Sequence, residues 1–294
     1  MTKVTVSSKE FNTFILSILN VDRSGVSLKL YNDYIEALVL SEDNSSIILY
    51  TKLNIIEQCG VEDEMVIHIK DLTKFQRLLD MNDGETFTFT IRNNHVYFEN
   101  NMVKGAKFML ADRPSRVVNA KVNVQWFNSF EKTSRMTISK GAIKKIIQCS
   151  SFTSDDANKV YLYQDNQRKY RKVHEHEVGT HVLDSLNNEY REVIYPDEVA
   201  DWVEFEVSAV VAEINDRTKN NLDNMSIYIG EIEEGQMEGK VILNVSTLSR
   251  LFLADEMTLE TSFIGQGVSR TEIVFLSFTN DNVSVRYLLN TLRS

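Results

Sequence analysis

Three histidines and an acidic residue lie close together in the second half of the chain. His174, Glu175 and His176 are consecutive, and His181 follows shortly after them. Alternate residues of a strand share one face, so the first two imidazoles have a spacing that metal ligands can use. Neither cysteine of the chain is near, and no HExxH or CxxC spacing is present. We therefore expect a solvated, charged strand here and no metal site.

Patterns that bind nucleotides or carry a nucleophile are missing from the sequence. The chain has no GxxxxGK[ST] loop, no GxGxxG and no GxSxG, so nucleotide hydrolysis and a serine nucleophile lack support. Asp155 and Asp156 follow a serine in a polar stretch, which is more typical of a loop than of a catalytic carboxylate pair. Trp126, Phe127 and Phe130 are interpreted as core or interface residues, not as a base-stacking platform. The sequence predicts neither an enzyme nor a cofactor.

The composition indicates a globular protein with an acidic surface. The 294 residues suit two domains, and 43% are hydrophobic and 25% charged, close to the averages for soluble proteins. No apolar run reaches the roughly 18 residues of a membrane span, and the start lacks a secretory segment. Two cysteines are too few for a disulfide framework, which favours the cytoplasm, or the host cytoplasm if the chain is viral. The net charge of −10 argues by itself against an outer surface that binds phosphates.

Short runs in which apolar and polar residues alternate dominate the chain. This period of two is typical of half-buried antiparallel strands, and turn residues separate the runs. We predict strands over 26–30, 86–91, 95–98, 203–207, 226–229 and 283–287.

Four stretches change to helical spacing, each with an apolar stripe on one face. The predicted helices span 8–20, 70–81, 139–150 and 246–254. Ser7 with Glu10 forms a capping box for the first, and Ser139 and Ser246 are predicted to cap the third and fourth. Each helix directly follows a strand.

This strand–helix unit occurs twice in each half of the chain. A shift of 132 residues aligns 4–7 with 136–139, and a shift of 176 aligns 67–75 with 243–251. A repeat of this kind indicates two domains of the same architecture. The larger second shift implies about 44 additional residues between the two helices of the second half.

The domain boundaries follow from the repeat and from local composition. Residues 111–124 lack periodicity and include Pro114, as expected of a linker. We therefore predict a first domain over 1–110 and a second over 125–294. The additional residues are placed within about 165–222, where polar and charged side chains cluster.

A chain of two such halves joined by a central linker resembles the DNA sliding clamps. Its length is similar to that of the two-domain type, proliferating cell nuclear antigen (PCNA) and its phage relatives, which close as homotrimers. The best local match is 66–75, a strand and helix followed by the pair of strands 85–99. The resemblance implies an α+β DNA-clamp fold, with antiparallel sheets outside and two short helices per domain facing the hole of a ring. It offers no role for 165–222.

The charge pattern can be compared with this expectation. The four predicted helices sum to +5, which leaves −15 for the rest of the chain. Such a partition suits a protein that repels DNA from outside and holds the phosphates of encircled duplex DNA without reading its sequence. The candidate DNA-binding residues are Lys9, Lys70, Lys74, Arg77, Lys140, Lys144, Lys145 and Arg250.

The resemblance also implies partners. A clamp of this family tethers a DNA polymerase through a hydrophobic groove to which the linker and the C-terminal segment contribute. An ATP-dependent clamp loader would open the ring, since this chain has no nucleotide site. Matched by position, the groove residues are Leu110, Val117, Val118, Leu288 and Leu292.

Two other functions remain open from the sequence. One is a structural or interaction protein built of β-rich domains that never meets DNA. The other is a monomeric, clamp-like polymerase accessory subunit that binds DNA through an open basic face. The +5 on the helices is modest for that second function, so encirclement is favoured.

Overall fold

The computed structural model of the chain describes eleven stretches. They are 1–41, 47–98, 103, 105–114, 124–152, 159–172, 202–214, 225–238, 240–251, 253–265 and 271–291. Two compact units are present, Met1–Glu131 with Ser262–Thr291, and Lys132–Thr261 with the last three residues.

The described residues of the first unit form strands of two antiparallel sheets and three helices. One sheet has the order β1-β6-β7-β8, and the strands of the other run in the order β15-β16-β4-β3-β2-β5. The elements are β1 (Thr2–Ser7), α1 (Ser8–Leu19), β2 (Val26–Leu30), β3 (Tyr34–Leu40), β4 (Ile47–Asn54), β5 (Met65–Ile69), α2 (Leu72–Leu79), β6 (Thr86–Arg92), β7 (His95–Phe98), β8 (Ala106–Met109), α3 (Val124–Asn128), β15 (Thr271–Thr279) and β16 (Val283–Asn290).

The described residues of the second unit form six strands and two helices. Its strands run in the order β13-β10-β11-β12-β9-β14, and β14 ends within the first unit. The elements are β9 (Lys132–Ser139), α4 (Lys140–Phe152), β10 (Lys159–Lys172), β11 (Trp202–Ile214), β12 (Met225–Gly235), β13 (Lys240–Asn244), α5 (Val245–Leu251) and β14 (Glu256–Ile264).

Local sequence explains how the strands connect. Asn93 and Asn94 both have positive φ, 47° and 59°, and join β6 to β7 between the paired residues Arg92 and His95. A two-residue hairpin turn of this kind needs positive φ at both positions, which asparagine tolerates better than most residues. All six predicted strands are present, several of them longer than predicted.

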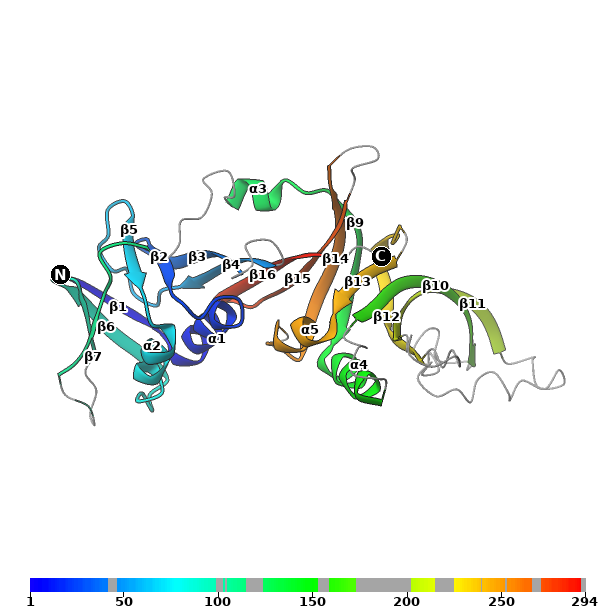
Figure 1. Cartoon of the computed structure of the whole chain (residues 1–294), viewed down its shortest axis with the longest axis horizontal. Helices are drawn as coiled ribbons and strands as arrows, with labels where there is room; N and C mark the ends of the chain where they lie inside the picture. The colour runs from blue at the N-terminus through cyan, green and yellow to red at the C-terminus, as the bar shows by residue number, and fades with distance from the viewer. Residues whose placement is uncertain are drawn as a thin grey trace. The chain divides into compact units, whose positions relative to one another are not determined.

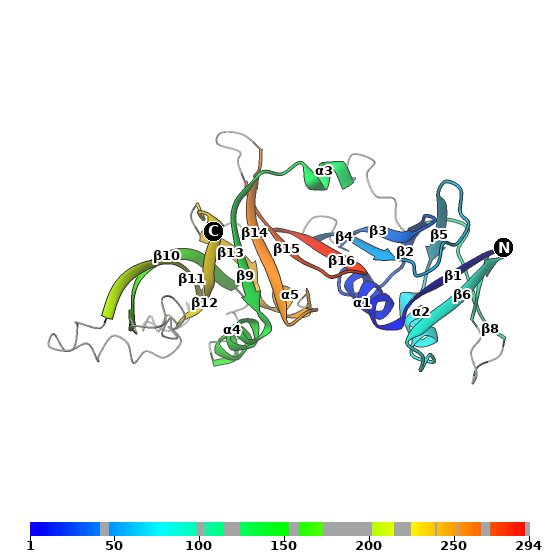
Figure 2. The same ribbon diagram turned by 180° about the vertical axis from the view of Figure 1, so that it is seen from behind.

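Aromatic side chains fill the core beneath α1. Phe11 is buried, and its ring lies 5.6–6.2 Å from the rings of Phe14, Phe75, Phe87 and Phe89. These rings come from α1, α2 and β6, so the core joins both helices to the sheet. Within this unit α1 and α2 lie side by side (Figure 1). In the second unit α4 packs against α5 in the same way (Figure 2).

The compact units differ from the predicted domains. Residues 262–291 pack with the first half of the chain, because β16 pairs with β4 over seven residue pairs from Leu289↔Ile47 to Val283↔Leu53. The predicted linker begins inside the first unit and ends at α3, a short helix that the sequence pattern did not indicate. A pairing between residues more than 200 positions apart leaves no trace in local periodicity.

Part of the predicted additional segment forms a long hairpin. β10 pairs with β11 from Tyr161↔Glu213 to Lys172↔Trp202, whereas it pairs with β13 only over 159–163. The hairpin therefore continues beyond the neighbouring strand. The rest of the segment, with His174, Glu175, His176 and His181, lies outside the described residues, as do Asp155 and Asp156.

Candidate nucleic-acid interface

The four candidate basic residues of the first unit lie on or beside its helix pair. Lys9 is on α1, Lys70 precedes α2, and Lys74 and Arg77 are on α2; all four are exposed. The buried faces carry apolar residues, including Phe11 on α1 and Phe75 on α2. Amphipathic spacing thus turns the cations away from the core.

Asp71 fixes the start of α2 and touches one of these cations. Its carboxylate accepts a hydrogen bond from the Lys74 backbone amide at 2.9 Å, as an N-cap does. The Lys74 Nζ lies 3.4 Å from the other carboxylate oxygen. The hydrogen bond from the Lys74 backbone amide lowers the pKa of Asp71 below its usual value, and the Lys74 side chain and the nearby Arg77 lower it further.

The second unit presents its basic residues in the same way. Lys140, Lys144 and Lys145 on α4 and Arg250 on α5 are all exposed. The apolar residues between them, such as Ile143, are buried. The helix pair of each unit therefore has exposed cations on its outer surface.

The caps of these helices agree with prediction in one case and differ in another. The Ser139 hydroxyl accepts a hydrogen bond from the Ala142 amide at 3.1 Å, so the predicted cap of α4 is confirmed. The predicted cap Ser246 is wrong, because α5 begins at Val245 and Asn244 Oδ1 accepts the Thr247 amide at 3.1 Å. At α1 the Ser7 hydroxyl bonds to the Glu10 carboxylate, without capping the backbone.

Most of these cations are available to a ligand. Within the described part of the chain, Lys74 is the one member of the eight that forms an ion pair. Exposed lysine and arginine side chains without a fixed partner attract phosphates at a strength that depends on salt, and they carry no sequence information. The surface suits weak, exchangeable contact with a nucleic-acid backbone.

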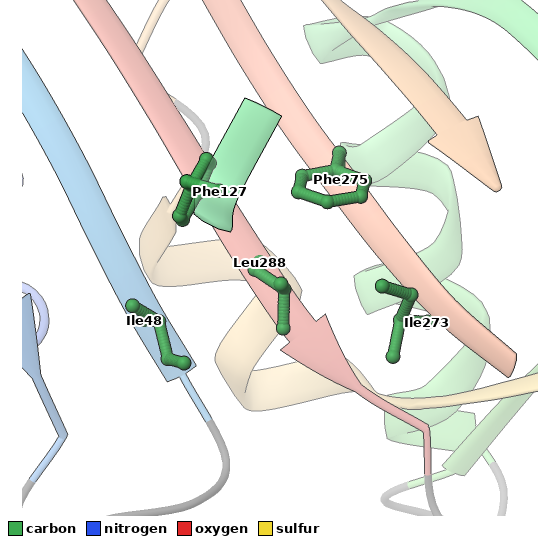
Figure 3. Packing of buried hydrophobic residues seen from close by; sticks show 5 residues of the cluster. All are labelled: Ile48, Phe127, Ile273, Phe275 and Leu288. Carbon is green, nitrogen blue, oxygen red and sulfur yellow. The ribbon is translucent and has the colours of Figure 1, made fainter. Parts of the chain in front are cut away.

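The candidate groove residues are only partly described. Leu110 and Leu288 are buried, at 5% and 1% exposure. Leu288 belongs to an apolar cluster with Ile48, Phe127 and two residues of β15 (Figure 3), which the sequence analysis did not connect to it. Val117, Val118 and Leu292 lie outside the described residues, so the groove remains a prediction.

Among the residues that the structure describes, no group of three or more His, Cys, Asp or Glu side chains is arranged to hold a metal ion. None of the described helices is long and apolar enough to cross a membrane.

The sheet order repeats across the chain in a way that defines the fold. β13-β10-β11-β12 corresponds to β5-β2-β3-β4, and β9-β14-β15-β16 corresponds to β1-β6-β7-β8. In each copy, the first strand of each group leads directly into a helix. β1 is followed by α1 and β5 by α2, and in the second copy β9 is followed by α4 and β13 by α5. This is the fold of the DNA sliding clamps of the PCNA type.

Solved structures with this fold cover the whole chain. PCNA from Thermococcus kodakaraensis matches with a TM-score of 0.63 at 13% identity. The match covers 99% of this chain and 100% of the PCNA chain. PCNA from A. fulgidus, solved with the C-terminal region of FEN-1 bound, has a TM-score of 0.65 at 12% identity, covering 100% and 99%. PCNA from Entamoeba histolytica matches with a TM-score of 0.63 at 12% identity, and the match covers 99% of both chains. No protein-family model and no curated protein sequence matches the chain.

Removal of the α2 cap should destabilise the protein in a pH-dependent way. The Asp71→Ala variant loses the acceptor for the Lys74 amide, so we expect a lower melting temperature than that of the wild-type protein at pH 7. Because the folded-state pKa of Asp71 is lowered, its stabilisation is present above the unfolded pKa and is lost as pH falls through the folded pKa. The difference in melting temperature between the two proteins should therefore shrink in acid.

The Asp71→Asn variant is the matched control, because an amide oxygen still accepts the backbone bond. It should melt close to the wild-type protein at pH 7. Equal melting temperatures of wild type and Asp71→Ala at pH 7 would contradict the assigned cap.

Proposed function

We propose that the chain is a sliding clamp that encircles duplex DNA and acts, without enzymatic activity, as a processivity factor. The observation that carries this proposal is the combination of the PCNA-type fold with exposed cations on both helix pairs, in a chain whose net charge is −10. The cations attract the phosphates that lie against the helices, while the acidic remainder disfavours other contacts with DNA. Retention is then topological, and the weak contacts allow sliding.

The repeat suggests how copies of the chain would close into a ring. β16 pairs with β4 within the chain. By the repeat, β8 corresponds to β16 and β12 corresponds to β4. Among the described residues, β8 pairs with β7 alone, and β12 pairs with β11 along 225–231 and then moves to β9. We infer that β8 of one copy pairs with β12 of the next, and the resemblance favours three copies.

The surface beside β8 supports contact with another copy. Met109 on β8 is 71% exposed and Tyr97 on β7 is 37% exposed. An unpaired strand edge flanked by exposed apolar side chains attracts a further strand, and proteins normally protect such an edge. Pairing with β12 would satisfy the edge and cover these side chains.

The partners follow from the proposal. A DNA polymerase would be tethered at a groove that includes the surroundings of Leu110 and Leu288, with Val117, Val118 and Leu292 as further candidates. An ATP-dependent loader would open the ring, which has no nucleotide motif of its own. The C-terminal region of FEN-1 is bound to the A. fulgidus PCNA, which supports a role for this fold in holding a partner through a terminal segment.

Retention on DNA should depend on the absence of free ends and on the helix cations. A clamp loaded on nicked circular DNA stays bound and is lost once the circle is linearised. Charge reversal at Lys74, Lys144 and Lys145 should weaken salt-dependent DNA association by about tenfold or more, because phosphate contacts are lost, and leave the oligomer intact. Gel filtration of cross-linked protein–DNA complexes measures retention, and light scattering measures the mass of the oligomer.

Charge reversal at Lys3, Lys29 and Lys159, exposed lysines outside the helices, is the matched control and should change retention little. Equal retention on circular and linear DNA would contradict encirclement. A monomer with that behaviour would favour the open-face accessory subunit, and a protein that never binds DNA would favour the structural alternative.

Ring closure should be sensitive to a single amide of β8. The Leu110 amide donates to Asn94 O at 2.9 Å, and successive amides of an antiparallel strand point in turn to one edge and then to the other. The Lys107 amide therefore points away from β7. Lys107→Pro removes that donor, so it should shift the solution mass towards the 33.8 kDa monomer, whereas Lys107→Ala, which keeps the amide, should not. Identical masses for the two variants would contradict the β8–β12 interface.

A further inference from the structure

An acidic residue lies among the basic residues at the start of α2. Lys74 and Arg77 are three positions apart on the exposed side of the helix, and Lys70 comes just before its first turn. Asp71, the N-cap of α2, stands between Lys70 and Lys74. A surface that attracts phosphates gains nothing from an anion here, so the contacts of this carboxylate decide its effect on the neighbouring cations.

The two carboxylate oxygens of Asp71 contact two different groups of Lys74. Oδ1 accepts the hydrogen bond of the Lys74 backbone amide at 2.9 Å, and Oδ2 lies 3.4 Å from the Lys74 ammonium. The cap bond fixes the carboxylate at the end of the helix, so only the lysine side chain has to be ordered when the ion pair forms. The helix start therefore presents an anion to Lys74 at a constant position.

The carboxylate is ionised at neutral pH. The backbone amide, and then the Lys74 and Arg77 side chains, hold the pKa of Asp71 below its usual value. A phosphate that approaches Lys74 must therefore displace an anion. The two anions also repel each other within the Debye length, which is about 8 Å at physiological salt.

The other described helices with candidate basic residues have neutral caps. The Ser139 hydroxyl caps α4, and the Asn244 amide oxygen caps α5. At α1, Ser7 makes no side-chain cap bond to the backbone. The residue three positions after Asn244 is Thr247, so α5 also lacks a lysine at the place of Lys74. A cap requires an acceptor and not a charge, so the charge of Asp71 is additional to what the helix needs.

We propose that Asp71 is a positioning residue of the basic helix surface: its carboxylate holds the Lys74 ammonium and competes for it with a phosphate, so that α2 contributes less to DNA affinity than its cations would alone. The inference deepens the proposed function and rests on it, because the surface concerned is the one that would face the duplex. An exposed ion pair is weak, so a phosphate can take the lysine and lose it again. Such exchange keeps each contact short, as sliding requires.

The first test measures the binding of full-length protein to end-labelled linear duplex DNA by fluorescence anisotropy over a series of salt concentrations. Asp71→Asn keeps the cap acceptor and removes the charge. It should bind about two- to fivefold more tightly than wild type at low salt, the range expected from the loss of an exposed ion pair. The slope of log affinity against log salt should steepen by about 0.9, because one more phosphate is neutralised.

Asp80→Asn is the matched control. Asp80 is the exposed C-cap of the same helix, and it forms no ion pair among the described residues. The control removes the same charge, so it should change affinity less and leave the slope unaltered. Equal effects of the two variants would overturn the proposal. Weaker binding by Asp71→Asn would also overturn it, because the carboxylate would then direct Lys74 towards the phosphate.

A second test needs no change at Asp71. Lys74→Ala should cost less DNA affinity than Lys144→Ala, because Lys144 forms no ion pair in the described part of the chain. In the Asp71→Asn background the cost of Lys74→Ala should rise by about two- to fivefold. An equal cost in both backgrounds would overturn the proposal.

The two levels of the account fail in different ways. A wild-type protein that binds neither linear nor circular DNA would remove the proposed function together with this inference. A wild-type protein that binds DNA and is unaffected by Asp71→Asn would remove the role of Asp71 alone.

Discussion

The backbone ladder between β4 and β16 is the interaction on which the first unit depends. Hydrogen bonding along seven residue pairs joins a strand near the start of the chain to one near its end. It adds β16 and β15 to the four strands β4-β3-β2-β5. Both faces of the enlarged sheet then carry pairs of apolar side chains. Leu49 and Tyr287 lie on the face of α1, whereas Ile48 and Leu288 lie under α3. One ladder thus supports both the surface that carries the basic helices and the apolar cluster around Phe127 on the opposite face.

The same ladder explains the proposed assembly. A sheet edge exposes amides and carbonyls that must find partners or remain in water. Within the chain, the second repeat supplies β16 to satisfy β4. The first repeat has an equivalent strand, β8, and the second an equivalent acceptor, β12. Repetition of one contact between copies closes a ring if the rotation permits, and this requires no type of interaction that the chain does not already contain.

The sequence predicted elements that depend on local pattern and missed those that depend on distant contacts. The helix α4 begins where Ser139 placed it, because a serine before an apolar stripe is a local signal. The cap of α5 was predicted at Ser246, but Asn244 was a competing cap two residues earlier and its side chain accepts the amide. The basic residues of the helices are exposed because amphipathic spacing determines the outer face.

The apolar cluster around Phe127 could not be predicted in the same way. Five residues are too few to show helical periodicity, so α3 was invisible to pattern, and Trp126, Phe127 and Phe130 could be interpreted only as core or interface. Their contacts with Phe275 and Arg286 join segments about 150 residues apart. The burial of Leu288 has the same origin, because its neighbours come from β4 and α3. A cluster built from such contacts becomes visible only in the folded chain.

Amide hydrogen exchange along β8 in the assembled protein tests the central claim most directly. Lys107 and Met109 have amides on the edge away from β7, as the Leu110 bond to Asn94 indicates. If β8 pairs with β12 of another copy, these two amides exchange as slowly as those of the paired strand β7, and dilution below the assembly concentration releases them. Rapid exchange of both amides in an oligomer whose β7 amides remain protected would contradict ring closure through this edge.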